Sequence, residues 1–207
     1  MNIIKRAILC IVHPFDCYDI IKRDEKKFKC FIPIIFYVLA TAVNYSYLFY
    51  VHFPLSIRDV ADANILLEAG IIVFPHFSWV IASYAITAIM DGESTFMQQF
   101  EAATYALVPV IVFIPLLGAF SLVLTNTEAG IYTFLYSAVF LMLIVYLFLA
   151  LMILNDYTFL KAILVTFLSI LAMIVMWCVL LLLLSLTIQL FTFFSNLYNE
   201  FEMKTFV

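Results

Sequence analysis

The stretch DGESTFMQQFEAATYALVP, residues 91–109, interrupts the apolar runs of the chain with turn, cap and kink residues in succession. Asp91-Gly92 marks a turn directly after an apolar run. Thr95 and Gln98 have the spacing of a capping box, in which each side chain satisfies a backbone amide of the other residue. The pattern therefore predicts a turn followed by a helix that begins near residue 96.

The helix predicted from residue 96 has two faces and leads into the next apolar run. Phe96 and Phe100 share one stripe, whereas Gln98, Gln99 and Glu101 are expected to face headgroups or water. Pro109 lacks the amide that would bond the carbonyl four residues earlier, so a kink is predicted there. The stretch thus describes a fixed re-entry into the bilayer.

The rest of the chain has the composition of an integral membrane protein. Of its 207 residues, 67% are apolar and 12% are charged, and the mean hydropathy is +1.15, whereas globular proteins have about 45–50% apolar and about 25% charged residues. Five charge-free runs each reach the roughly 20 residues that a helix needs to cross the hydrocarbon core. Because these runs are continuously apolar, helices are favoured over barrel strands. The sequence predicts an all-α, polytopic membrane protein with five spans, at about 31–51, 65–89, 103–124, 131–154 and 162–190.

The last charge-free run, 162–199, is too long for one crossing. Its 38 residues correspond to about 57 Å of helix, whereas the hydrocarbon core is about 30 Å thick. No turn signal divides the run, so two spans are not expected. The part from Gln189 onward, QLFTFFSNLYN, is aromatic and polar, and we expect it to leave the membrane as a helical extension.

The basic residues set the predicted orientation. Seven of the ten Lys and Arg residues precede residue 31, and an excess of basic residues marks the cytoplasmic side of a membrane protein. The N-terminus is therefore predicted to be cytoplasmic, which with five spans places the C-terminus outside. The four cysteines provide no disulfide framework, because three of them lie in this cytoplasmic segment.

Residues 1–30 are predicted to be a cytoplasmic interfacial segment, and residues 31–207 the transmembrane domain. Apolar residues at helical spacing before and after Pro14 indicate two short amphipathic helices with their apolar faces in the acyl boundary. Cys10, His13 and Cys17 have a spacing that could face a metal. Pro14 breaks the helix there, however, and a closed zinc site needs a fourth ligand. Neither a metal site nor a cofactor is predicted.

Two polar residues are predicted to lie well within spans. Asn44 is expected to bond a neighbouring helix. His76 follows Pro75 near the middle of its span and is expected, as a neutral side chain, to bond a helix carbonyl or Asn44, with a proton relay as the alternative. Glu68 is placed near the outer surface, which leaves no acid deep in a span to exchange protons with His76.

The order of residues around the quoted stretch resembles the YIP1-domain family. The resemblance is carried by Trp79, Gly92, Thr95, Phe100 and the sequence YALVP from Tyr105 to Pro109, and these residues are also the candidate contact with a protein partner. Two further segments, HPFDCYDIIK at 13–22 and YTFLKA at 157–162, are similar to the interfacial start of the short bacterial members and to the opening of the family's last span. The family pattern joins a span, a small Gly-containing cytoplasmic loop, an amphipathic stretch and the entry into the next span.

The resemblance implies a location in the plasma membrane of a bacterium. Eukaryotic members are Golgi and endoplasmic-reticulum proteins linked to small GTPases and vesicle traffic, and they carry a sizeable cytosolic N-terminal region that this chain does not have. A GTPase-linked role is therefore not expected. The short bacterial members have no established activity.

The residues argue against an enzyme. The chain has no HExxH, GxSG or GxGD motif, its three histidines lie in different segments, and its three arginines are scattered. We expect a non-catalytic membrane protein that organises or stabilises a membrane protein assembly, in contact with lipids and other integral membrane proteins and not with nucleic acid. The alternatives are an accessory membrane subunit of a multi-component transporter, for example of the ABC type, and a small transporter or channel.

Overall fold

A computed structural model describes residues 3–23, 31–51 and 63–205, with side chains up to residue 196. Every regular element in these ranges is a helix. The α-helices are α1 (Ile3–Val12), α2 (Pro14–Arg23), α3 (Phe31–Tyr50), α4 (Ile65–Ile89), α5 (Phe96–Ala106), α6 (Val108–Ser121), α7 (Ala129–Leu154) and α8 (Phe159–Thr205). A short 3-10 turn, η3 (Asn126–Glu128), precedes α7.

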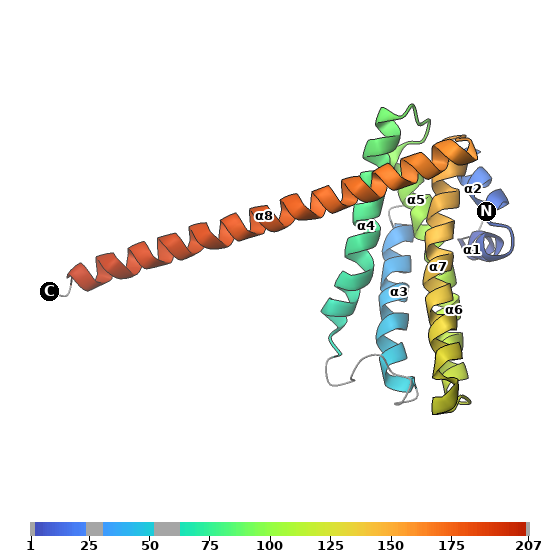
Figure 1. Cartoon of the computed structure of the whole chain (residues 1–207), viewed down its shortest axis with the longest axis horizontal. Helices are drawn as coiled ribbons and strands as arrows, with labels where there is room; N and C mark the ends of the chain where they lie inside the picture. Colours follow the sequence, from blue (N-terminus) through green and yellow to red (C-terminus); the bar gives the residue numbers. More distant parts are fainter. Residues whose placement is uncertain (1–2, 24–30, 52–62, 206–207) are drawn as a thin grey trace.

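Five helical stretches within the described residues are long and apolar enough to cross a membrane. Four of them, α3, α4, the α5–α6 pair and α7, run side by side as a bundle, and α8 runs crosswise over one end of it (Figure 1). The prediction of an all-α membrane protein with five such helices is confirmed. The end of the bundle where α4 stops and α5 begins is called here the α5 end.

The third apolar stretch is broken into two helices, as its sequence predicts. The Thr95 amide donates to Gln98 Oε1 at 2.9 Å and the Gln98 amide to Thr95 Oγ1 at 3.4 Å, so the capping box starts α5 at Phe96. The helix then breaks at Leu107, and Pro109 occupies the first turn of α6, where its missing amide costs nothing. The predicted kink before Pro109 is therefore confirmed.

Helices α1 and α2 pack into the α5 end rather than lying free in the interface (Figure 1). Their buried side chains belong to one core cluster with α5, α6 and α7, and those side chains are Cys10, Cys17, Tyr18 and Ile21. Ile4, Ile8 and Val12 repeat every four residues and remain exposed on the other side of α1. Only this second face fits the expectation of an apolar face turned to acyl chains.

Helices α4 and α7 end at the α5 end with the same backbone geometry. Asp91 and Asp156 both have a positive φ, 55° and 49°, directly after the C-cap residues Met90 and Asn155. The Gly92 amide donates to the Thr87 carbonyl at 2.8 Å, and the Tyr157 amide donates to the carbonyl five residues before it at 3.1 Å. These bonds define two Schellman motifs, in which the left-handed residue turns the chain back.

Helix α8 is held to the bundle only by its first half. Trp177 Nε1 donates to Ser78 Oγ at 3.0 Å, and the Trp177 and Phe74 rings lie 5.5 Å apart. Residues 179–196 are exposed on every side, and this part of α8 projects away from the bundle (Figure 1). Only 6% of the most apolar part of α8 is buried, compared with 28–61% for the other four spans. The C-terminal extension is helical, as predicted.

Candidate functional site

A polar stripe on α4 forms the starting point of the site. Trp79, Ser83 and Thr87 lie four residues apart, so they share one helix face. That face turns toward α5 and α7, and Ser83 and Thr87 are buried there. Each of these two hydroxyls donates to a carbonyl of its own helix, which leaves its oxygen able to accept from a neighbour.

Gln99 of α5 joins the stripe to the α4–α5 loop. Its Nε2 donates to Thr87 Oγ1 at 2.7 Å and to Ser94 Oγ at 2.8 Å, and its Oε1 accepts from Ser83 Oγ at 3.3 Å. The expectation that Gln99 faces headgroups or water is wrong, because only 7% of the residue is exposed. Since α5 lies between α4 and α7, both of its sides are covered by helices.

Asn155 links the same network to α7. Its Oδ1 accepts from the Ser94 amide at 3.2 Å and from Ser94 Oγ at 2.7 Å, while its Nδ2 donates to the Leu151 carbonyl at 2.9 Å. Gly92 lies against this amide: a Cβ there would be 2.6 Å from Asn155 Oδ1 and 2.9 Å from the Thr87 carbonyl. The close packing of the α4–α5 loop against Thr87 and Asn155, rather than a left-handed backbone, is what requires glycine at this position.

Tyr157 closes the network where α7 turns into α8. Its hydroxyl donates to the Met90 carbonyl at 3.1 Å, at the end of α4. Burial, followed by the charge of Asp91, raises the pKa of Tyr157. Lys161 lies 4.4 Å from the centre of its ring, in a cation–π arrangement. The start of α8 is thereby fixed to the end of α4.

An ion pair joins the N-terminal helices to α5. Arg6 Nη1 donates to Glu101 Oε1 at 2.8 Å, and the two side chains are 11% and 15% exposed. The expectation that Glu101 faces headgroups or water is wrong, because α1 covers that side of α5. Further along, Lys22 pairs with Asp156, and Gln98 Nε2 donates to the Lys22 carbonyl at 3.2 Å.

Asn44 and His76, the two polar residues predicted to lie within spans, each form a hydrogen bond to a neighbouring helix. Asn44 Nδ2 donates to Glu68 Oε2 at 2.6 Å, which confirms a helix-to-helix bond for Asn44. Glu68 lies in the first turn of α4 and is buried. His76 Nε2 lies 2.9 Å from the Ala103 carbonyl, and its Nδ1 lies 2.7 Å from the Tyr37 hydroxyl. Because a carbonyl only accepts, Nε2 carries the proton of the neutral ring and Nδ1 accepts from Tyr37.

His76 therefore caps the break between α5 and α6. In an unbroken helix the Ala103 carbonyl would accept from the Leu107 amide. That amide donates instead to the Thr104 carbonyl at 3.1 Å. The Ala103 carbonyl is then free for His76 Nε2, as the sequence predicts with its expectation of a helix carbonyl.

The family-like residues are distributed over this region in different roles. Thr95 forms the α5 cap and Pro109 opens α6. Phe100 packs edge-on against Phe77 of α4, with ring centres 5.9 Å apart. Tyr105 is fully buried, with its ring 5.3 Å from that of a core phenylalanine in α3. These four residues hold α5 in place, whereas Gly92 and Trp79 lie at the polar network itself.

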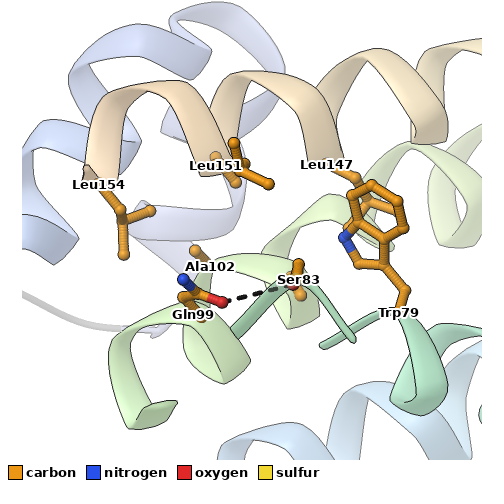
Figure 2. A pocket seen from close by; sticks show the side chains of 9 residues that line it. Trp79, Ser83, Gln99, Ala102, Leu147, Leu151 and Leu154 are labelled. Carbon is orange, nitrogen blue, oxygen red and sulfur yellow. Dashed lines mark hydrogen bonds between the residues drawn. The ribbon is translucent and has the colours of Figure 1, made fainter. Parts of the chain in front are cut away.

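A cavity of about 10 Å3 lies beside Trp79, between α4, α5 and α7 (Figure 2). Ser83 and Gln99 provide its polar wall, and the leucines of α7 cover the opposite side. In the described part of the chain, no three His, Cys, Asp or Glu side chains gather to hold a metal. The chemistry of this end is a network of hydrogen bonds between side chains and backbone groups, beside a cavity with space for about one water molecule.

Sequence reasoning missed Ser83, Thr87 and Asn155. The spacing of four from Trp79 to Thr87 was a usable signal, because it places three polar-tipped side chains on one face. Asn155 gave no such signal, since an Asn-Asp pair after an apolar run is typical of a solvated helix end.

Comparison with known proteins places the chain in a family. A family model described as Yip1 domain matches residues 8–180, which include α2 to α7, the second half of α1 and nearly the first half of α8. No curated protein and no solved structure matches the chain. The matched range covers well over half of the sequence and includes the whole polar network at the α5 end, so the chain belongs to the Yip1 domain family.

Proposed function

We propose that this protein is a non-catalytic member of its family that organises or stabilises a membrane protein assembly, with α8 as its main contact surface. The proposal rests on a difference between the α5 end and α8. The polar groups at the α5 end bond one another, whereas α8 presents a long apolar surface that its own bundle does not cover.

The length of α8 supports a protein partner for its far half. Transmembrane helices tilt by at most about 40° in most structures, and at that tilt a 30 Å core takes up about 26 residues. The apolar span of α8 has 38 residues. Phe191, Phe193 and Phe194 lie in the part left over and are well exposed. An apolar surface of this kind marks an interaction site.

The proposed partners are other integral membrane proteins, with lipids covering the remaining apolar faces. Partners that are transporter subunits would make this chain an accessory subunit, for example of an ABC-type transporter. The orientation proposed from the basic residues places the α5 end on the cytoplasmic side of a bacterial plasma membrane. A C-terminus outside, the second part of that proposal, requires α8 to turn from its crosswise direction in Figure 1 into line with the other four spans.

Site-specific photocrosslinking in cells tests the contact surface. A photoreactive residue at Leu182 or Phe191, both exposed, is expected to give defined crosslinks to another protein. The same residue at Leu164, exposed in the first half of α8, is the matched control and is expected to give weaker crosslinks. Crosslinks to lipid alone at all three positions would contradict the proposal.

Purification separates the alternatives. Recovery with permease or ATPase subunits in mild detergent would assign the accessory role. Recovery as a monomer that supports solute flux in liposomes would overturn the organising role in favour of a transporter. The orientation is tested with all native cysteines replaced: a single cysteine at Ser195 is expected to label from outside intact cells, and one at Glu93 is not.

A further inference from the structure

The indole Nε1–H of Trp79 faces the cavity. Figure 2 shows its nitrogen turned toward the space between Ser83, Gln99 and the α7 leucines. Among the described residues, Ser83 and Gln99 bond each other at 3.3 Å, and Trp79 Nε1 takes part in no hydrogen bond. Trp177, the other tryptophan, donates directly to Ser78. The donor of Trp79 thus has a cavity in front of it instead of a protein acceptor.

The position of Trp79 makes an unsatisfied donor costly. It lies ten residues before the end of α4, which is about 15 Å along the helix and hence within the hydrocarbon depth. A polar group without a partner at that depth costs several kcal/mol. No described residue accepts a hydrogen bond from Trp79 Nε1. A small ligand in the cavity would have to accept from the indole, and it could donate to the oxygens of Ser83 and Gln99.

The cavity has the size and polarity for one water molecule. Its volume is about 10 Å3, close to the least that one water requires. Water also requires two to four polar partners. The indole provides a donor, and Ser83 Oγ and Gln99 Oε1 provide acceptors with a lone pair to spare.

We propose that this cavity binds a single water molecule, which accepts from Trp79 Nε1 and donates to Ser83 Oγ and Gln99 Oε1. The polar stripe of α4 continues from Trp79 through Ser83 and Thr87 toward the α5 end, where Ser94 bonds Gln99. The water would add Trp79 to the direct bond between Ser83 of α4 and Gln99 of α5. This proposal is independent of the proposed function.

Solution NMR of the full chain in detergent micelles tests the water site. The protein is labelled with 15N-tryptophan, and its two indole signals are assigned with Trp177→Phe. The Trp79 indole proton is expected to show a cross-peak at the water frequency. Ala102→Val and Ala150→Val each add a bulkier side chain to a wall of the cavity, one from α5 and one from α7. Both are expected to abolish the cross-peak.

The two cavity-filling variants distinguish a cross-peak to bound water from a cross-peak relayed by an exchanging hydroxyl proton. Ser83 keeps its hydroxyl in both, so a signal relayed by that group would persist. Two variants from opposite walls are used because either one alone could fail to fold, and folding is checked by the dispersion of both indole signals. The proposal is overturned by the absence of a water cross-peak, by its persistence in the folded filling variants, or by cross-peaks to detergent alkyl protons in its place.

Discussion

Replacing Gly92 with alanine probes the contact between the ends of α4 and α7. The added Cβ would lie 2.6 Å from Asn155 Oδ1 and 2.9 Å from both Cβ and the carbonyl oxygen of Thr87. Distances this short require the loop or α7 to shift. The shift would break the two bonds that Asn155 Oδ1 accepts from Ser94.

The expected loss of stability follows from these contacts. Two hydrogen bonds contribute about 1 kcal/mol each, and overpacking a close-packed site costs about 1–3 kcal/mol. Alanine restricts the unfolded chain more than glycine does, which offsets about 0.4–1 kcal/mol of this loss. We therefore expect Gly92→Ala to lower the free energy of unfolding by about 3 kcal/mol.

Reversible unfolding in mixed micelles of a mild detergent and dodecyl sulfate, followed by circular dichroism, measures the effect. Gly70→Ala is the matched control, because no atom lies within 4 Å of its added Cβ. Alanine in a helix interior is favoured there by about 0.5–1 kcal/mol, so this control should be slightly stabilised. If the contact with Asn155 carries the loss, Gly92→Ala is expected to cost less in an Asn155→Ala background. Wild-type stability of Gly92→Ala, with Gly70→Ala behaving as expected, would refute the reasoning.

Three further substitutions test separate contacts, each by the same unfolding measurement. His76→Phe keeps a ring but leaves the Ala103 carbonyl uncapped, so a loss of about 1–3 kcal/mol is expected; an unchanged stability would exclude the capping role. Asp91→Gly relieves a positive φ of 55° and should stabilise by about 0.5–1 kcal/mol; destabilisation would show that the carboxylate is needed. Glu101→Gln weakens the ion pair with Arg6 and should cost about 2 kcal/mol while exposing α1 to limited proteolysis; unchanged protease resistance would show that the pair does not hold α1.

Several local features could be predicted because they depend on residues close in sequence. The capping box at Thr95 and the break before Pro109 need only the chemistry of one hydroxyl, one amide and one missing N–H. The expectation that His76 bonds a helix carbonyl also proved correct. A buried polar side chain in a span requires a partner, and the backbone offers one wherever a helix is broken.

Long-range pairings could not be predicted in the same way. Gln99 and Glu101 lie on the polar side of α5, and solvent was the simplest environment for them. Their actual surroundings depend on α1, α4 and α7, which cover both sides of α5. A helix periodicity defines a face of the helix, but it does not specify which other element covers that face.

The sequence by itself determined that this is an all-α membrane protein with five long apolar helices, since a charge-free run of about 20 residues is satisfied in hydrocarbon only as a helix. It also determined where α5 begins and where it breaks. The tertiary structure alone decided that α1 and α2 pack into the α5 end, and that α8 runs crosswise with its far half uncovered. It also decided that Gly92, Gln99 and Asn155 meet. The reason is that helices form from local contacts, whereas their pairing depends on side chains far apart in sequence that must fit one another in three dimensions.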